Sequence, residues 1–314
     1  MPTLTYHVPP GQDGRRLGVF LRGCGVTAGC IKAVKYQGGG FFADGVPLHT
    51  DQPVHTGQCI SFALPPENAT SVEPQPVEFG IAYEDDFAVV LDKPPHLAVH
   101  PTLNHPDHTL ANGWLYELQK RGQSGVFRPV NRIDKNTSGL VLCAKNAFAA
   151  PLLAGSAHKC YLAVVQGALQ PAKGIIDAPI ARRGDSIIGR CVREDGKPSR
   201  TQYTVLACGG NHSLVACTPL TGRTHQIRVH MAHLGHPLAG DTLYGGSDLQ
   251  IARHALHCAV VSFQHPIQGE EHIVFSPLPQ DLLALCEANG LLQGWQLQDL
   301  ACGNHKGVTE FEPD

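Results

Sequence analysis

"RPVNRIDKNTSGLVLCAKN" (residues 128–146) holds a single carboxylate, Asp134, between two cations, Arg132 and Lys135. A small polar turn follows, and then an apolar run over 139–145 that is typical of a buried strand. Such a carboxylate fits two situations equally well: a salt-bridged surface loop, or a catalytic aspartate that must stay ionised. The stretch therefore predicts a strand and leaves the role of its aspartate open.

Segments with strand-like and helix-like patterns alternate on both sides of this stretch. The further predicted strands cover residues 87–92, 160–167, 201–208 and 213–220. Helical spacing that ends at a glycine predicts helices over 108–122 and 224–235. Because strand pairs joined by short loops outnumber strand–helix–strand repeats, we expect an α+β fold with a mixed, largely antiparallel sheet.

A smaller unit precedes this domain. Residues 14–64 are compatible with two short helices, a β-hairpin turning at Asp44-Gly45 and one further strand. Residues 65–76 are rich in proline, glutamate and polar residues without a hydrophobic period, which is typical of a linker. The predicted divisions are a first domain over 1–70, a larger domain over 77–285 and a tail of low order over 290–314.

Composition excludes several classes of protein. Apolar residues make up 42% of the 314 and charged residues 16%, as in ordinary globular chains. No apolar run approaches the roughly 20 residues that a membrane-spanning helix needs, and the amino terminus has no apolar signal core. The 11 scattered cysteines are typical of reduced thiols. We therefore expect a cytoplasmic protein that does not enter a membrane.

The net charge of −3 hides a strong segregation of charge. Residues 11–36 hold five cations against one carboxylate, and residues 182–200 hold six against three. Residues 67–92 hold seven carboxylates and no cation. Such segregation gives either a local positive face or merely solvated surfaces of mixed sign.

The stretch 217–246 is the densest in polar groups. Gly222 permits a tight turn, and the helix predicted next presents Arg223, His225 and Arg228 near its amino end, where anions are favoured. A buried carboxylate is the natural partner of Arg228, and Asp134 stands at the head of its own strand. An arginine within about 4–6 Å favours the ionised form of a carboxylate. The pair would suit a nucleophile, and it would equally suit an inert structural bridge.

Other catalytic patterns are missing from the sequence. Four histidines, at positions 225, 230, 233 and 236, lack the i, i+4 spacing of a helical metal site, so we expect no bound metal. No phosphate-binding glycine loop and no G-x-S-x-G nucleophile elbow occurs, and no cofactor is expected. Tyr161, which follows basic Lys159, is either a platform for a nucleobase or an ordinary core tyrosine.

Taken together, four blocks of sequence in this order resemble the RluA/RluD-type pseudouridine synthases over roughly residues 77–275. They are "IAYEDDFAVVLDKPPHLAVHP" (81–101), "NRIDKNTSGLVLCAK" (131–145), "KCYLAVVQG" (159–167) and "LTGRTHQIRVHMAHLGHPLAGDTLYG" (220–245). The resemblance implies the pseudouridine synthase fold, with flanking helices and a central RNA-binding cleft. It also implies an RNA uridine isomerase that needs no cofactor.

The resemblance assigns roles by position. Asp134 would be the catalytic carboxylate, Arg228 the partner that keeps it ionised, and Tyr161 the ring that stacks on the target uracil. Arg132 would help to fill the space that a flipped uridine leaves. The remaining substrate contacts would come from Asn131, Thr137, Arg223 and His225. Asn131 departs from the family, because many members have histidine there.

Residues 14–64 resemble, more weakly, the alpha-L RNA-binding module first known from a small-subunit ribosomal protein. We thus expect a monomer acting on structured RNA, with large-subunit ribosomal RNA first and tRNA second. One alternative is a catalytically idle RNA-binding or ribosome-assembly factor on the same fold, although such a factor would not need Asp134, Tyr161 and Arg228 together. A glycosidase-like hydrolase would need a second carboxylate acid, and no block offers one.

Overall fold

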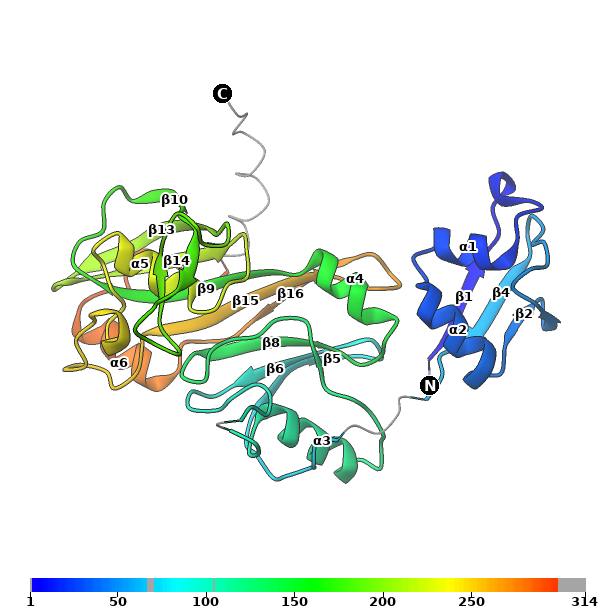
Figure 1. The fold of residues 1–314 in the computed structure, drawn as a ribbon, viewed down its shortest axis with the longest axis horizontal. Coiled ribbons are helices and arrows are strands. Elements are labelled where there is room, and N and C mark those ends of the chain that lie inside the picture. Colours follow the sequence, from blue (N-terminus) through cyan, green and yellow to red (C-terminus); the bar gives the residue numbers. More distant parts are fainter. Residues whose placement is uncertain (1, 67–70, 104, 299–314) are drawn as a thin grey trace.

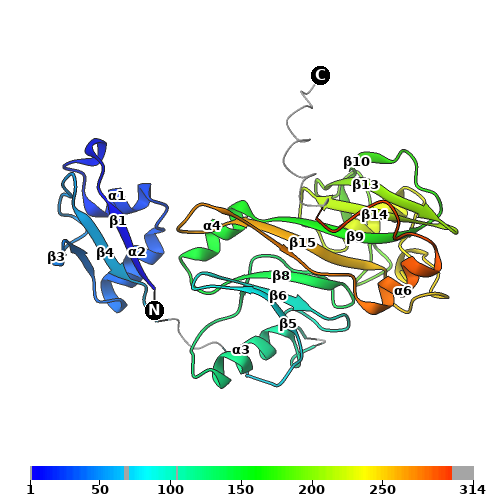
Figure 2. The ribbon, with the colours of Figure 1, turned by 180° about the vertical axis from the view of Figure 1, so that it is seen from behind.

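The computed structural model describes residues 2–66, 71–103 and 105–298. Figures 1 and 2 show a small N-terminal sheet with two helices and a larger body built on one long, twisted sheet. None of the described helices has the length and apolar character needed to cross a bilayer. The fold is α+β, as the sequence predicts.

The N-terminal body is a four-stranded antiparallel sheet of order β1-β4-β2-β3, covered by two helices. Its elements are β1 (Thr3–His7), the 3₁₀ turn η1 (Pro10–Gln12), α1 (Leu17–Gly23), α2 (Ala28–Gln37), β2 (Phe41–Ala43), β3 (Val46–Leu48) and β4 (Cys59–Ala63). The Thr27 side chain accepts a hydrogen bond from the Cys30 N–H and so caps α2. Asp44 and Gly45 both have positive φ, as the predicted tight hairpin turn requires.

The larger body is built on a ten-stranded sheet. The main path runs β10-β13-β14-β9-β15-β8-β6-β5, with β16 paired to β15 and β7 to β8. The strands are β5 (Gly80–Glu84), β6 (Ala88–Lys93), β7 (Arg128–Pro129), β8 (Ser138–Ala144), β9 (His158–Gln166), β10 (Lys173–Asp177), β13 (Arg200–Gly209), β14 (His212–Pro219), β15 (Leu256–Gln264) and β16 (Glu271–Phe275). The five strands predicted from the sequence are all present.

A two-stranded hairpin and four helices complete this body. The hairpin pairs β11 (Ile180–Arg182) with β12 (Arg190–Val192), and the helices are α3 (Leu110–Lys120), α4 (Ala149–Ser156), α5 (Gln226–His233) and α6 (Gln280–Ala288), with a 3₁₀ turn η2 (Thr242–Tyr244). Helix α4 packs on β15 and β8, and α5 packs on β12, β13 and β14. Figure 1 shows α3 beside β5 and β6.

Strand β15 is the centre of the sheet. It pairs antiparallel with β9 on one side and parallel with β8 on the other, and every one of its residues except Gln264 is buried. This strand was not predicted from the sequence, although its apolar run is similar to those of β6, β8 and β9, which were predicted. Strand β1 and the hairpin β11–β12, which are short, were not predicted either.

The C-terminal residues are packed as far as they are described. Leu282, Leu285 and Cys286 of α6 join a core cluster with residues of β9, β14 and β15. Leu291 is fully buried in the same cluster, and Trp295 and Leu297 pack against it. The packed structure therefore continues beyond the predicted boundary at 285 into the segment assigned to the tail, whose residues 299–314 lie outside the described part.

The parallel contact between β8 and β15 depends on a glycine. Gly139 has φ +102°, and a Cβ built there would lie 2.3 Å from the Cys258 carbonyl oxygen. Both the backbone conformation and the space exclude an L side chain. The close approach of the two strands at the Gly139–Cys258 pair therefore requires glycine at position 139.

Gly139→Ala should destabilise the protein by about 2–5 kcal/mol, the sum of backbone strain and overpacking. Thermal unfolding monitored by near-UV circular dichroism measures the effect. Gly155→Ala in α4 is the control, because a Cβ there meets no atom within 4 Å. Equal unfolding temperatures for the two variants would contradict the close approach of β8 and β15.

Candidate active site

A cavity of about 590 Å³ lies between the segment that precedes β8, strand β9 and the start of helix α5. Its walls come from residues 129–135 and 137 before β8, from Lys159 and Tyr161 on β9, and from residues 219 and 221–228 up to the first turn of α5. The loop after β6 adds residues including Ala98, His100 and His105. All eight site residues predicted from the sequence line this cavity: Asn131, Arg132, Asp134, Thr137, Tyr161, Arg223, His225 and Arg228.

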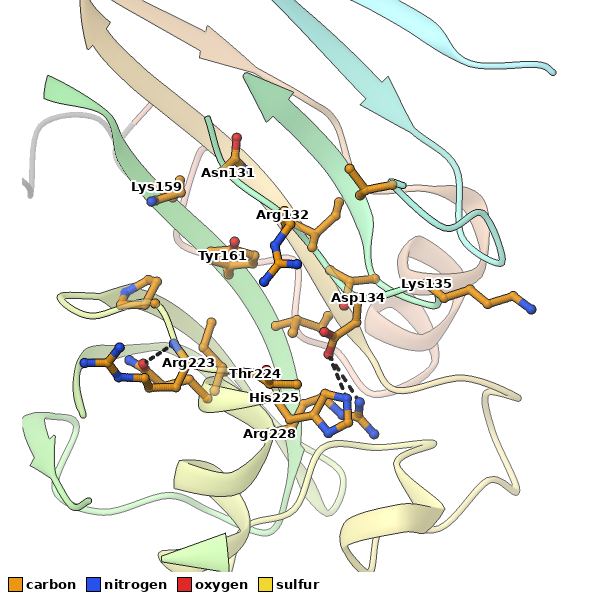
Figure 3. A pocket seen from close by; sticks show the side chains of 18 of the residues that line it. Asn131, Arg132, Asp134, Lys135, Lys159, Tyr161, Arg223, Thr224, His225 and Arg228 are labelled. Carbon is orange, nitrogen blue, oxygen red and sulfur yellow. Dashed lines mark hydrogen bonds and ion pairs between the residues drawn. The ribbon is translucent and has the colours of Figure 1, made fainter. Parts of the chain in front are cut away.

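Asp134 lies at the edge of the cavity beside two cation-capable groups. Its Oδ2 accepts a hydrogen bond from Nη1 of Arg228 at 3.2 Å, and Nε2 of His225 lies 3.8 Å from the same oxygen (Figure 3). The side chain is 28% exposed, whereas that of Arg228 is only 8% exposed. The predicted long-range pair between Asp134 and Arg228 is therefore present, with the carboxylate facing the cavity and the guanidinium behind it.

Arg228 is held from behind by a second carboxylate. Its Nε and Nη2 donate to the two oxygens of Asp241, at 2.7 and 2.8 Å, and the Asp241 side chain is 1% exposed. Burial opposes the charged form of Arg228, but the hydrogen bonds and charge of Asp241 outweigh it and raise the pKa of Arg228. The planar guanidinium thus bridges a buried structural carboxylate and a cavity-facing one.

His225 lies beside this bridge in an unusual backbone conformation. It precedes α5 with φ 59° and ψ 18°, in the left-handed region. Its Nδ1 is 2.7 Å from the hydroxyl of Tyr244, which also receives the Arg190 N–H at 3.0 Å. Burial lowers the pKa of His225, and Arg228 and Arg190 lower it further against the opposing effect of Asp134. A neutral imidazole is favoured next to Asp134.

Tyr161 faces the cavity from β9 and is 7% exposed. Cys217 and Cys258 stand opposite it on the neighbouring strands. Burial, followed by the nearby Cys258, raises the pKa of Tyr161 well above its usual value. The phenol is therefore neutral. Its ring lies on the cavity wall, as Figure 3 shows.

Two buried cationic side chains bind backbone carbonyls in the segment that follows Asp134. The Lys93 ammonium donates to the carbonyls of Pro94 and Lys135 at 2.8 and 3.0 Å. The Arg253 guanidinium donates to the Asn136 carbonyl at 3.0 Å and is itself paired with Asp281. These contacts fix the backbone on the C-terminal side of Asp134.

Thr137, in the same segment, also binds a buried side chain. Its hydroxyl lies 2.8 Å from Nε2 of His254, whose pKa burial lowers to about 2, with Arg228 and Arg253 adding to the effect. His254 is therefore a neutral partner. The Thr137 hydroxyl is occupied by this bond, although the residue lines the cavity.

The remaining predicted substrate contacts differ in how free their side chains are. Arg132 is exposed and lines the cavity, and its charge contributes to lowering the pKa of His100. Arg223 is exposed and its Nε donates to the Pro198 carbonyl. Asn131 is buried, and its amide donates to the Leu140 carbonyl and accepts from the Leu142 N–H of β8. Asn131 thus uses both ends of its amide to extend the pairing along β8.

The histidines of 225–236 do not converge on one point. His230 bonds to Thr201 and to the Ala178 carbonyl, and His236 bonds to the Gln166 carbonyl. Within the described part of the chain, no group of three or more His, Cys, Asp or Glu side chains is placed to hold a metal ion.

Sequence reasoning missed Asp241, Tyr244, Lys93, Arg253 and His254. Asp241, Tyr244 and Lys93 lie inside the blocks that resemble the family, but the resemblance assigned no role to these three residues. Arg253 and His254 stand just before β15, and the residues that they bind in the Asp134 loop are more than 100 positions away in sequence. Nothing local to these residues indicates such contacts.

Comparison with known proteins gives one consistent set of matches. A family model described as RNA pseudouridylate synthase matches residues 87–233. A Bacillus subtilis protein named "Uncharacterized RNA pseudouridine synthase YjbO" is 38% identical over 267 residues, covering 83% of this chain and 94% of that protein. "Ribosomal large subunit pseudouridine synthase D" of Xanthomonas campestris is 37% identical, covering 90% of this chain and 91% of that protein.

Among solved structures, the "Human RNA Pseudouridylate Synthase Domain Containing 1" is similar to this chain. The TM-score is 0.57 at 28% sequence identity, with 75% of this chain and 96% of that chain covered. The residues that the family model matches lie within the larger body and include most of those that line the cavity.

The Asp241 carboxylate should be far more important for stability than a comparable surface carboxylate. Asp241→Ala leaves a buried guanidinium with half of its partners, and breaking a buried pair in this way costs about 3–5 kcal/mol. Asp185→Ala is the matched control, because Asp185 also binds an arginine, Arg183, through two hydrogen bonds but is exposed. Urea unfolding should show that the control loses at most about 1 kcal/mol of its unfolding free energy. Similar losses for both variants would refute the buried bridge.

Lys93 should make stability depend on pH. Burial lowers its pKa from 10.5 to about 7, so between these values the unfolded chain holds a proton that the folded chain has released. The contribution of Lys93 to the unfolding free energy therefore rises as the pH rises from about 7. Lys93→Met removes this term, and its stability relative to wild type should fall by on the order of 1 kcal/mol per pH unit over that interval. Urea unfolding at pH 6, 8 and 9 tests this, and parallel curves would contradict it.

Proposed function

The chain belongs to the RNA pseudouridylate synthase family, and we propose that it uses Asp134 as the catalytic carboxylate to modify ribosomal large-subunit RNA. Its activity is the isomerisation of uridine in RNA to pseudouridine. The observation that carries the assignment of Asp134 is its hydrogen bond to the buried Arg228 at the edge of the cavity. An idle RNA-binding factor would not need a carboxylate held in this way.

The reaction requires only the groups that the cavity offers. The carbon–nitrogen bond between uracil and ribose breaks, the base turns, and its carbon five forms the new bond to the ribose. The proton on carbon five is then lost and the nitrogen released from the ribose takes up a proton, so the reaction balances without an oxidant, reductant or external group. Asp134 either attacks the anomeric carbon or removes a ribose proton to start an elimination, and both routes need an ionised carboxylate.

Arg228 holds the Asp134 carboxylate in one orientation. Its guanidinium offers Nη1 to one oxygen of Asp134, while Asp241 holds the other side of the plane. No described residue donates a hydrogen bond to Oδ1 of Asp134, which leaves that oxygen for the substrate. The fixed guanidinium also limits the directions in which the carboxylate can turn.

Tyr161 and Arg132 are proposed to handle the flipped base. The Tyr161 ring lies on the cavity wall, where a uracil could stack on it, a contact worth about 1–3 kcal/mol. Arg132 is exposed at the cavity edge, on the side from which RNA would approach. The energy of these contacts would offset the few kcal/mol needed to unstack the uridine.

The substrate assignment rests on the similarity to the protein named ribosomal large subunit pseudouridine synthase D, with tRNA as the second choice. We propose that the enzyme works as a monomer in the cytoplasm, with residues 77–285 as the catalytic domain. Residues 1–70 are proposed to add RNA affinity. All five cations of 11–36 are exposed there, namely Arg15, Arg16, Arg22, Lys32 and Lys35.

Asp134→Asn should lower the rate of pseudouridine formation by about 10³-fold or more, because the amide cannot serve as a nucleophile or base. Affinity for the RNA should change by less than threefold. Tritium release from ribosomal RNA labelled at carbon five of uridine measures turnover, and fluorescence anisotropy measures binding. Asp185→Asn, an exposed carboxylate outside the cavity, is the control.

Pseudouridine mapping in cells that lack this protein tests the substrate. Reintroducing the wild-type protein should restore modification in large-subunit ribosomal RNA, and Asp134→Asn should restore none. Restoration by the Asn variant would refute the catalytic role. Restoration in tRNA alone would refute the ribosomal assignment and keep the activity.

A further inference from the structure

A second cavity of about 440 Å³ adjoins the active one. It is lined by the hairpin β11–β12 and by residues 195–197. Gly222, Arg223 and Thr224 line both cavities, so the two hollows meet at the turn before α5. A chain leaving the active cavity past Arg223 would enter the second one.

The second cavity carries an excess of positive charge. Its lining holds four cations, Arg182, Arg190, Lys197 and Arg223, against the single carboxylate of Asp195. Asp195 is already bound to the guanidinium of Arg193, outside the lining. None of the four lining cations has a described carboxylate within 4.0 Å.

The basic segment 182–200 thus divides into two sets. Arg183, Arg193 and Arg200 are each paired with a carboxylate, from Asp185, Asp195 and Asp177 respectively. The other three cations of the segment, Arg182, Arg190 and Lys197, are the ones that line the cavity. The cations that lack a carboxylate partner are therefore gathered on one surface.

Two of them also face each other directly. Arg182 and Arg190 are cross-strand partners in the hairpin register. Like charges directly opposite each other destabilise an antiparallel pair. A bound anion would remove that repulsion, and arginine is well suited to a phosphate because its planar fork can donate two bonds to it.

The hairpin is tied to the catalytic carboxylate. The Tyr244 hydroxyl receives the Arg190 N–H and lies 2.7 Å from Nδ1 of His225, whose Nε2 is 3.8 Å from Asp134. An anion on this hairpin would therefore lie at a fixed position relative to the reacting uridine.

We propose that the second cavity binds the phosphodiester backbone of the nucleotides adjoining the target uridine, through Arg182, Arg190, Lys197 and Arg223. This proposal rests on the proposed function, because it places RNA in the first cavity. A repeated anion on a continuous chain fits two cavities that share a wall better than a free phosphate does.

The test compares two double variants that each remove two positive charges from the same segment. Arg182→Ala/Lys197→Ala removes two exposed cations that line the cavity. Arg183→Ala/Arg200→Ala removes the half-buried Arg183 and the exposed Arg200, which are paired with carboxylates outside it. The first should raise KM about tenfold or more near physiological salt with kcat within twofold. The second should leave both within twofold of wild type.

Salt dependence gives a second readout. Each lost phosphate contact should lower the slope of log KM against log salt by about 0.7, so the first variant should lose about 1.4 and the control almost nothing. Equal behaviour of the two variants would overturn the proposal. So would a fall in kcat at unchanged KM, which would indicate a role in the chemical step.

Substrates with a single uncharged methylphosphonate linkage locate the contact. In wild type, the substitution at one or two linkages next to the target uridine should raise KM. In the Arg182→Ala/Lys197→Ala variant, substitution at those same linkages should raise KM no further. Additive losses at every linkage would refute the contact and favour binding of a free anion. If wild type forms no pseudouridine in any of these RNAs, the proposed substrate fails; an active wild type with indistinguishable variants refutes only the second cavity.

Discussion

The architecture of the site depends on one guanidinium that bridges two carboxylates. Nε and Nη2 of Arg228 donate hydrogen bonds to Asp241. Nη1 points toward the cavity and donates to Asp134. A lone Arg228–Asp134 pair would be free to swing as a unit. With Asp241 buried behind it, the arginine is immobile and the exposed carboxylate takes its orientation from the protein interior.

The sheet supplies the other half of this arrangement. Asp134 stands just before β8, and β8 runs parallel to β15 in contact so close that only glycine fits at position 139. Lys93 at the end of β6 and Arg253 ahead of β15 bind carbonyls of the same segment. Three strands that are distant in sequence therefore converge below the loop that carries Asp134, and this loop lines the cavity.

Sequence patterns predicted the elements with a strong local signal. The apolar runs of β6, β8 and β9, the helix α3 and the hairpin turn at Asp44-Gly45 are all where the patterns indicate. The Asp134–Arg228 contact was also predicted, because a buried carboxylate is the natural partner of a helix-borne arginine and Asp134 stands at the head of a strand. By contrast, Asp241, Lys93 and Arg253 act through partners that only the folded sheet brings near. Likewise, nothing in the letters of 182–200 distinguishes Arg182 from Arg183; the hairpin register decides which of them is neutralised.

The junction of β8 and β15 has a consequence for the order in which the chain can become active during synthesis. The N-terminal sheet is complete once β4 has emerged, because all of its pairings lie within the first 63 residues. The loop of Asp134, however, finds its partners Arg228, Arg253 and His254 about one hundred residues later. A nascent chain would thus carry its small N-terminal body folded while the Asp134 carboxylate still lacked support. Competence for chemistry comes only when the last third of the protein has left the ribosome.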